Sequence, residues 1–185
     1  MNLSEHIDPN HILEIAPDEA WPEYEGIKLG LIADTHGKLS AQAYKALEHS
    51  ELILHAGDIV GQEIIDELET IAPLRAVLGN NDYVGEYGPA IGFFDVFKAG
   101  NLRFKLIHKP SDIGPYDQDV IVFGHTHRPH FEYIDSQSEY GKTLLINPGS
   151  CSRSRSSYGH TVARLIVNHD EVVYFALVRL DEKRI

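Results

Sequence analysis

The sequence IKLGLIADTHGKLSAQAYKALEHSELILHAGD, residues 27–58, carries the pattern that decides the fold. Residues 27–33, apolar apart from Lys28, have the length and composition of a buried strand. Residues 41–50 then predict a helix, with Ser40 in position to act as its N-cap. The apolar run within residues 51–58 predicts the next strand. The stretch therefore predicts one strand–helix–strand unit.

The same alternation continues in the next segment of the chain. Residues 62–72 predict a helix whose apolar face is made by Ile64, Ile65, Leu68 and Ile71. The sequence LRAVLGNND, residues 74–82, predicts a third strand. Strands that alternate with helices pair in parallel through right-handed crossovers. The first half of the chain is therefore predicted to form parallel strands with helices packed on them.

The second half of the chain is predicted to be mostly β. Residues 91–108 predict a hairpin that turns at Gly100-Asn101. Further strand-like segments follow, separated by short turns, at residues 119–124, 130–135, 143–150, 161–170 and 171–180. Alternation of strands and helices followed by strands predicts an α/β fold of two sheets packed face to face, with helices on the outer faces.

Residues 1–26 are interpreted as an N-terminal extension to a single domain over residues 27–185. The extension is acidic and interrupted by proline, with at most a short helix near residues 12–15. A chain of 185 residues with 43% apolar residues can bury one core large enough to fold alone. The patch at residues 152–157, rich in serine and arginine, is expected to form a mobile loop.

Composition and charge exclude several classes of protein. The formal net charge is −12 and the Lys and Arg residues are scattered, which argues against a protein that grips duplex nucleic acid. Cys151 is the single cysteine, so an intramolecular disulfide and a thiolate metal cluster are excluded. The N-terminal residues lack the pattern of a signal peptide, and no apolar segment has the length of a membrane helix. We therefore expect a cytoplasmic protein that does not bind membranes.

Side chains that bind metals follow the predicted strands. Sites in α/β sheets lie beyond the carboxyl ends of the strands, and here these ends carry Asp34, His36, Asp58, Asn80, His108, His125 and His127. Side chains on an extended backbone repeat with period two, so His125 and His127 are expected to face the same side. The same alternation puts His108 in phase with the apolar residues of its strand.

Each of these residues alone has a simpler interpretation. An aspartate can cap a turn, an Asn-Asn pair can form a left-handed turn, and a histidine can lie in the core with a backbone partner. Together they favour a metal centre, because turns do not require histidine. Carboxylate, amide and imidazole ligands without thiolates suit Mn²⁺, Fe, Zn²⁺ or Ni²⁺. The set exceeds what one tetrahedral ion takes, which favours two ions about 3.5–4 Å apart that share one carboxylate.

These residues, in this order, resemble the motifs of the calcineurin-like metallophosphoesterases, most closely those of their small prokaryotic phosphodiesterase branch. The motifs are Asp34-Thr35-His36, Gly57-Asp58, Gly79-Asn80-Asn81-Asp82, His108, Gly124-His125-Thr126-His127 and Asn147-Pro148-Gly149-Ser150. The resemblance implies a four-layer αββα sandwich of two mixed β-sheets flanked by helices. It also implies two divalent metal ions, with manganese expected first and iron, zinc or nickel as alternatives.

The resemblance also implies a role for each ligand. Carried over position by position, it assigns one ion to Asp34, His36 and His127. It assigns the other ion to Asn80, His108 and His125, with Asp58 as the bridge. Asp58, Asn80 and His108 would then be central to catalysis, in which a hydroxide activated by the two ions attacks a phosphate ester.

Two positions depart from the pattern of the family. Asn81 stands where many members have the histidine that protonates the leaving group, and an amide has no proton to transfer at neutral pH. Lys109 stands where glycine usually follows the histidine, and it is interpreted as a solvated side chain rather than a phosphate anchor. Residues expected near the mouth of the site, each more simply a surface residue, are Arg128, His130, Arg153 and Arg155.

The leading hypothesis is a metal-dependent phosphoesterase that hydrolyses small phosphodiesters. The alternative is a non-catalytic scaffold that keeps the fold and binds another protein, which the resemblance also implies, because relatives of this fold include a retromer subunit. A nuclease would use the same chemistry, but the net charge of −12 makes binding of a polyanion less favourable. Members of this branch are often described as dimers or higher oligomers, so a homodimer or a higher oligomer is also expected.

Overall fold

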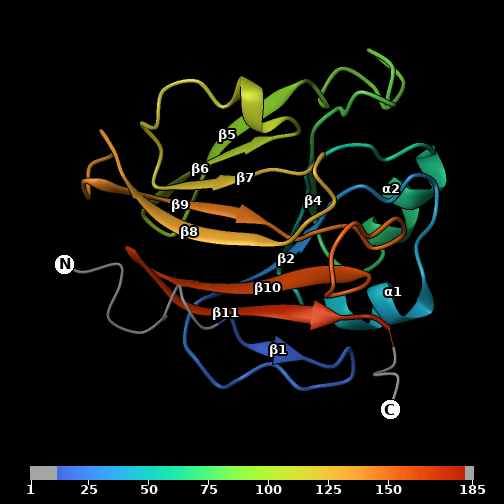
Figure 1. Cartoon of the computed structure of the whole chain (residues 1–185), viewed down its shortest axis with the longest axis horizontal. Helices are drawn as coiled ribbons and strands as arrows, with labels where there is room; N and C mark the ends of the chain where they lie inside the picture. Colours follow the sequence, from blue (N-terminus) through green and yellow to red (C-terminus); the bar gives the residue numbers. More distant parts are fainter. Residues whose placement is uncertain (1–11, 182–185) are drawn as a thin grey trace.

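The computed structural model describes residues 12–181, which form two mixed β-sheets packed face to face. Figure 1 shows the two sheets stacked one above the other, with both α-helices gathered at one side. The chain thus has the α/β architecture of two packed sheets that the sequence predicts.

One sheet has six strands, which are, in order of pairing, β1 (Glu14–Ile15), β11 (Glu171–Arg179), β10 (Thr161–Asn168), β2 (Ile27–Ile32), β3 (Leu52–His55) and β4 (Leu74–Ala76). Strands β2, β3 and β4 pair in parallel because a helix lies in each connection between them. Strand β10 pairs antiparallel with both β2 and β11. The predicted parallel strands are therefore confirmed, within a mixed sheet.

The other sheet has five strands, which are, in order of pairing, β5 (Phe94–Ala99), β6 (Leu102–Ile107), β7 (Val120–Val122), β9 (Lys142–Asn147) and β8 (His130–Asp135). The central strands β6, β7 and β9 are parallel, and the two edge strands are antiparallel to their neighbours. The predicted hairpin is confirmed: β5 and β6 pair directly, with Gly100 at φ 59° in the turn between them.

The main core lies between the two sheets. In β2, Leu29 and Leu31 pack into this core, and Ile32 packs on the opposite face against the helices. Both faces of the strand are covered from Leu29 onwards, which explains why residues 29–32 are apolar instead of alternating with polar residues. Full burial of each such leucine stabilises the fold by about 1.5–3 kcal/mol.

Two α-helices cover the outer face of the six-stranded sheet: α1 (Ala41–Leu47) and α2 (Gln62–Glu69). The predicted N-cap is confirmed, since the Ser40 hydroxyl accepts a hydrogen bond from the Ala43 amide at 3.1 Å. Both helices end earlier than predicted. On the outer face of the five-stranded sheet lies the 3₁₀ turn η1 (Pro110–Asp112), where Ile113 packs against Ile107. None of the described helices is long and apolar enough to cross a membrane.

The described part of the N-terminal segment, residues 12–26, packs against the domain. The short helix predicted near residues 12–15 is wrong: Glu14–Ile15 form β1, which pairs in parallel with β11. A two-residue strand has too few side chains to show a pattern, and its partner lies at the other end of the chain. The buried Arg164 side chain holds the segment, because it donates hydrogen bonds to the carbonyl oxygens of Pro17 at 3.1 Å and Glu19 at 2.6 Å. Residues 1–11 of the expected extension lie outside the described part of the chain.

Candidate metal centre

All the expected ligands lie in loops that follow strands of the two sheets. Asp34 and His36 follow β2, and Asp58 follows β3, while Asn80 comes shortly after β4. The other sheet contributes His108 after β6 and the loop that follows β7, which contains His125 and His127. Because these strands are parallel within each sheet, their carboxyl ends meet at one edge of the sandwich.

Most of these side chains project from strained backbone. The φ angles are positive, in the left-handed region, for Asp34 (53°), His36 (47°), Asp58 (56°), His125 (68°) and His127 (57°). A non-glycine residue in this region costs about 1–3 kcal/mol, and such residues cluster at functional sites. The expectation of an extended backbone through His125 and His127 is therefore wrong. Their imidazoles both reach the centre because the loop turns, not because a strand repeats with period two.

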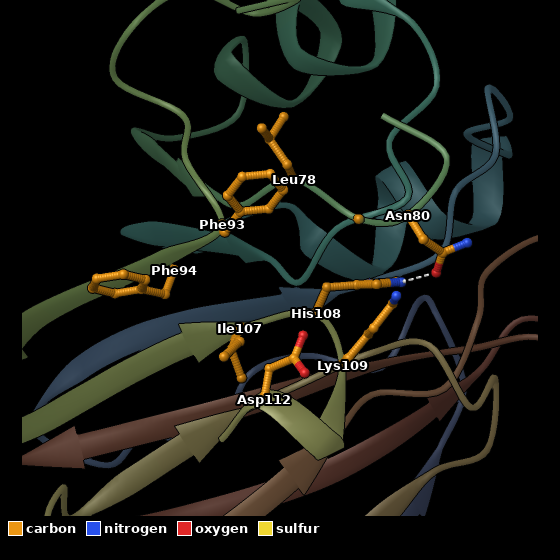
Figure 2. A pocket seen from close by; sticks show the side chains of 9 residues that line it. Leu78, Asn80, Phe93, Phe94, Ile107, His108, Lys109 and Asp112 are labelled. Atoms are coloured by element: carbon orange, nitrogen blue, oxygen red, sulfur yellow. Dashed lines mark hydrogen bonds between the residues drawn. The ribbon is translucent and has the colours of Figure 1, made fainter. Parts of the chain in front are cut away.

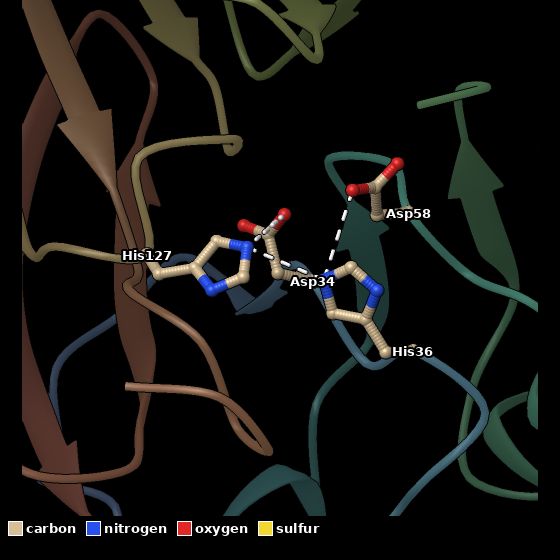
Figure 3. Close-up of side chains that lie close together, drawn as sticks. All are labelled: Asp34, His36, Asp58 and His127. Atoms are coloured by element: carbon tan, nitrogen blue, oxygen red, sulfur yellow. Dashed lines mark hydrogen bonds and ion pairs between the residues drawn. The ribbon is translucent and has the colours of Figure 1, made fainter. Parts of the chain in front are cut away.

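The first group of ligands consists of Asp34, His36, Asp58 and His127, and it offers ligand atoms that all lie within 4.8 Å of one another. Figure 3 shows the imidazoles of His36 and His127 pointing at each other, with the Asp34 and Asp58 carboxylates beside them. Their Nε2 atoms are 3.2 Å apart, and the His127 Nε2 lies 3.3 Å from Asp34 Oδ1. The His36 Nε2 lies 3.7 Å from Asp58 Oδ2. This geometry suits one divalent ion at the centre of the group.

The second group lies on the other side of Asp58. The Asn80 Oδ1 atom is 3.1 Å from the Nε2 of His108 and 2.9 Å from the Nδ1 of His125. The Nε2 of His108 is also 3.5 Å from Asp58 Oδ1. Asp58 thus presents one oxygen to each group of ligands, as a bridging carboxylate would.

The donors and acceptors in both groups fit metal ions. The Nδ1 of His127 lies 2.6 Å from the carbonyl oxygen of Arg153, and that of His108 lies 2.8 Å from the carbonyl of Ala56. A carbonyl oxygen accepts only, so each neutral ring carries its proton on Nδ1 and turns a lone pair on Nε2 towards the centre. These lone pairs face carboxylate and amide oxygens, which are also acceptors. Convergent acceptors repel one another unless a cation lies between them.

The charges of the centre also shift the imidazole pKa values. The hydrogen bond to Asp34 raises the pKa of His127, so a proton is favoured where a metal ion would otherwise bind. Burial lowers the pKa of His36, and burial together with the nearby His108 lowers the pKa of His125. Two of these imidazoles are therefore held in the neutral form that binds metals.

Asn81 has a position that the sequence could not reveal. Its side-chain Nδ2 donates a hydrogen bond to Asp58 Oδ2 at 2.7 Å, and its backbone N–H donates to Asp58 Oδ1 at 2.8 Å. Burial alone would raise the pKa of Asp58, but these hydrogen bonds and the charge of His108 outweigh burial and lower it. The Asn81 amide is thus engaged with the Asp58 carboxylate and holds it in one orientation.

Glycine and Asp82 bring the loops close together. A Cβ on Gly57 would lie 2.7 Å from the His108 Nδ1, and one on Gly124 would lie 2.8 Å from the carbonyl oxygen of Ala56, so neither position tolerates a side chain. The Asp82 carboxylate accepts hydrogen bonds from the backbone N–H groups of Gly79 at 2.7 Å and Val60 at 2.9 Å. Asp82 therefore joins the loops after β3 and β4. Its place in the third motif was the signal that could have indicated this role.

Two further features supporting the centre were missed in the sequence. His55 belongs to none of the motifs, but it is fully buried; its Nδ1 accepts a hydrogen bond from the Gly57 N–H, and its Nε2 lies 3.0 Å from the Thr35 hydroxyl. The serine- and arginine-rich loop, expected to be mobile, is tied to the site. Its Ser152 hydroxyl donates to the Asp34 carbonyl at 3.1 Å, and its Arg153 carbonyl orients His127.

The other candidate residues lie around the edge of the centre. His130 is at the surface, 3.1 Å from the Glu132 carboxylate, and Arg128 donates to the carbonyl oxygen of Arg155 at 3.2 Å. Cys151 is buried, and its thiol donates a weak hydrogen bond to the Lys38 carbonyl at 3.6 Å. Lys109 lines a pocket together with Asn80 and His108.

The sequence of the chain matches a family model described as the calcineurin-like phosphoesterase superfamily domain, over residues 27–170. The chain belongs to this superfamily. The resemblance stated from the motifs is therefore confirmed.

Proteins of similar sequence carry the names of metallophosphoesterases and of a phosphodiesterase. It is 32% identical over 140 residues to a probable metallophosphoesterase of Methanothermobacter thermautotrophicus, covering 66% of this chain and 76% of that protein. It is 31% identical over 150 residues to a phosphodiesterase of Methanocaldococcus jannaschii, covering 68% of this chain and 84% of that protein. These relatives support a hydrolase of phosphate esters.

Solved structures share the fold at lower sequence identity. The Escherichia coli phosphoesterase YfcE superposes with a TM-score of 0.58 at 20% identity, covering 84% of this chain and 100% of that one. Vps29 of Entamoeba histolytica, solved with zinc, superposes with a TM-score of 0.62 at 21% identity and the same coverage. The predicted fold class is confirmed by these likenesses.

Proposed function

We propose that this protein is a metal-dependent phosphodiesterase whose centre binds two divalent ions. Asp34, His36 and His127 would hold one ion, and the other would be held by Asn80, His108 and His125. Asp58, with one oxygen directed to each group, would bridge the two. The observation that carries the proposal is the convergence of acceptor atoms from both sheets on two adjacent positions.

The residues of the chain have distinct parts in the proposed reaction. Divalent ions bound here would act as Lewis acids on a water molecule and on the phosphate oxygens. The Ala56 and Arg153 carbonyls fix the tautomers of His108 and His127, so that their Nε2 lone pairs stay directed at the centre. Asn81 holds the Asp58 carboxylate in one orientation. The chain would thus act mainly by placing fixed charge where the phosphate binds.

We infer a preference for diesters over monoesters. A dianionic monoester gains more from a strong acid at the leaving group and from extra cations than a diester does. The Asn81 amide is engaged with Asp58 and has no proton to transfer. The phosphodiesterase name of the Methanocaldococcus jannaschii relative supports the same preference.

Manganese is the first metal that we propose. The centre offers carboxylate, amide and imidazole ligands, a set that suits Mn²⁺ and also admits iron, zinc or nickel. The one thiol of the chain, Cys151, is buried, and burial raises its pKa to about 12, so it would not supply a thiolate ligand.

The test is hydrolysis of bis(4-nitrophenyl) phosphate by purified protein with added Mn²⁺, with a chelator, and after metal is restored. We expect activity that chelation abolishes and Mn²⁺ restores, together with two metal ions per chain by elemental analysis. Asp58→Ala should lose activity and metal, whereas the matched change at an exposed carboxylate, Asp117→Ala, should lose neither. Activity that survives both chelation and Asp58→Ala would falsify the proposal.

A scaffold that binds another protein is the alternative function. The same experiment separates the two, because a scaffold would bind metal without turnover of either diesters or monoesters. The set of acceptors, complete for two ions, favours the enzyme, since a scaffold has no need of the second group around Asn80.

A further inference from the structure

A pocket of about 250 Å³ opens directly beside the second group of metal ligands. Figure 2 shows Asn80 and His108 on one side of this pocket and the aromatic rings of Phe93 and Phe94 on the other. The volume is below the roughly 300–1,000 Å³ of sites that enclose whole drug-sized ligands. The pocket therefore has room for one ring of a molecule whose remainder lies at the metal centre.

The two phenylalanines are unusual for their exposure. Phe93 is 62% exposed and Phe94 is 63% exposed, although both lie next to the candidate centre. An apolar pair of this size in contact with water gains free energy when another apolar group covers it. A flat ring fits this position because aromatic side chains favour stacked or edge-on contacts with a second ring.

Lys109 supplies a positive charge between the pocket and the centre. Its side chain is half-buried and, in Figure 2, points towards the hydrogen bond between Asn80 and His108. In residues 12–181, Lys109 makes no ion pair with a carboxylate. The Asp112 carboxylate also lines the pocket, but it is exposed, so water screens its charge. An ammonium in this position suits a phosphate oxygen, which revises the interpretation of Lys109 as a solvated side chain.

We propose that this pocket binds the aromatic group of a phosphate ester, with Phe93 and Phe94 contacting the ring and Lys109 contacting a phosphate oxygen. The proposal rests on the proposed function, since it takes the phosphate to bind at the metal centre. It specifies the substrate class as phosphodiesters that carry an aryl group or a nucleobase. Diesters with only alkyl groups would leave the pocket without an occupant.

The test compares the binding of phenyl phosphate and methyl phosphate to the Mn²⁺-loaded protein by calorimetry. Burial of one ring against the two phenylalanines should make phenyl phosphate bind about tenfold more tightly. In Phe93→Ala/Phe94→Ala the two affinities should agree within about twofold, because the apolar contact is lost. Both side chains are exposed, so the double variant should fold, as circular dichroism would verify. The matched control is Val96→Ala, which removes an exposed apolar side chain from the same strand and should keep the tenfold ratio.

Lys109→Met is a separate arm of the experiment. It should weaken both ligands by roughly three- to tenfold, with their ratio unchanged, because it removes a charge that contacts phosphate. The control Lys98→Met removes an exposed lysine from β5 and should change neither affinity. Unchanged binding of both ligands in Lys109→Met would overturn the role of Lys109.

Two results would overturn the role of the pocket. One is a ratio of phenyl phosphate to methyl phosphate affinity near one in the unmodified protein with metal bound. The other is a tenfold ratio that survives in the double variant. Calorimetry does not need turnover, so the pocket and the proposed function fail separately. Metal-dependent hydrolysis together with equal affinity for the two ligands refutes only the role of the pocket. A tenfold affinity ratio in a protein that does not hydrolyse diesters supports the role of the pocket and refutes the phosphodiesterase activity.

Discussion

Removal of the Asn81 side chain tests whether this residue supports Asp58 or acts on the leaving group. In Asn81→Ala the backbone N–H still donates to Asp58 Oδ1, but the 2.7 Å hydrogen bond from Nδ2 to Oδ2 is lost. A hydrogen bond to a charged group contributes about 1.5–3 kcal/mol. Loss of such support for a metal ligand weakens metal binding by roughly 10- to 100-fold.

The effect should depend on pH in a defined direction. The Asn81 hydrogen bonds are among the causes that lower the pKa of Asp58 in the metal-free protein, so the variant should have a higher Asp58 pKa. A carboxyl with a higher pKa takes up a proton sooner as the pH falls, and that proton competes with the metal. The loss of metal affinity in Asn81→Ala should therefore be larger at pH 5 than at pH 7.

The assay is metal affinity by calorimetry at two pH values, with kcat measured at saturating Mn²⁺ on aryl diesters whose leaving groups differ in acidity. Asn81→Ala should lower the metal affinity, and the dependence of kcat on leaving-group acidity should match that of the unmodified protein. Asn101→Ala, at an exposed turn, is the matched control and should change neither quantity. The reasoning is refuted if metal affinity is unchanged while kcat falls most for the poorest leaving groups, because Asn81 would then act on the leaving group.

Three further predictions concern the centre and the residues that support it. His127→Ala should release one metal ion and His125→Ala the other, and each variant should lose hydrolysis. Elemental analysis would measure the metal content, and circular dichroism would show that the fold is retained. Loss of both ions at once in either variant would contradict the two-group assignment. Burial lowers the pKa of His55 from 6.5 in the unfolded chain to about 4 in the fold. The metal-free fold is therefore most stable above pH 6.5, where the imidazole is neutral in both states. About 3 kcal/mol of the free energy of unfolding is lost as the pH falls from 6.5 to 4. Urea unfolding should therefore show that acidification lowers the free energy of unfolding less in His55→Gln than in the unmodified protein. An equal fall in both proteins would contradict this role of His55. Arg164→Met should lower the free energy of unfolding by about 2–4 kcal/mol, since buried carbonyls lose their donors. The emission of Trp21, the single tryptophan, should shift to longer wavelength, because the Arg164 guanidinium lies 5.0 Å from its ring; an unshifted spectrum would contradict this.

Regular periodicity in the sequence predicted the positions of several elements well. The alternation in β6 correctly put His108 on the buried side of its strand, where it is 3% exposed. Ser40 correctly marked the start of α1. These features depend on residues close together in the chain, so local pattern was sufficient. In contrast, β1 depends on pairing with β11, and no local pattern predicts that contact.

The composition of the candidate centre came from sequence, and its geometry from the tertiary structure. The order of Asp, Asn and His at strand ends named the residues that converge, because parallel strands bring their carboxyl ends to one edge. The left-handed backbone at His125 and His127 was not predictable, since the strain is held by contacts of the whole fold.

By itself, the sequence determined the class of fold, the family and the residue types at the centre, since periodicity and motif order are properties of the chain. Only the tertiary structure decided that Asn81 supports Asp58, that Asp58 faces both groups of ligands, and that Lys109 lies beside an aromatic pocket. The physical reason is that a hydrogen bond or a close approach between loops forms only when the atoms are placed to within a few tenths of an ångström. Such positions arise only when the complete fold brings together loops that lie far apart in the sequence, as it does for Asp58 after β3 and Asn81 after β4.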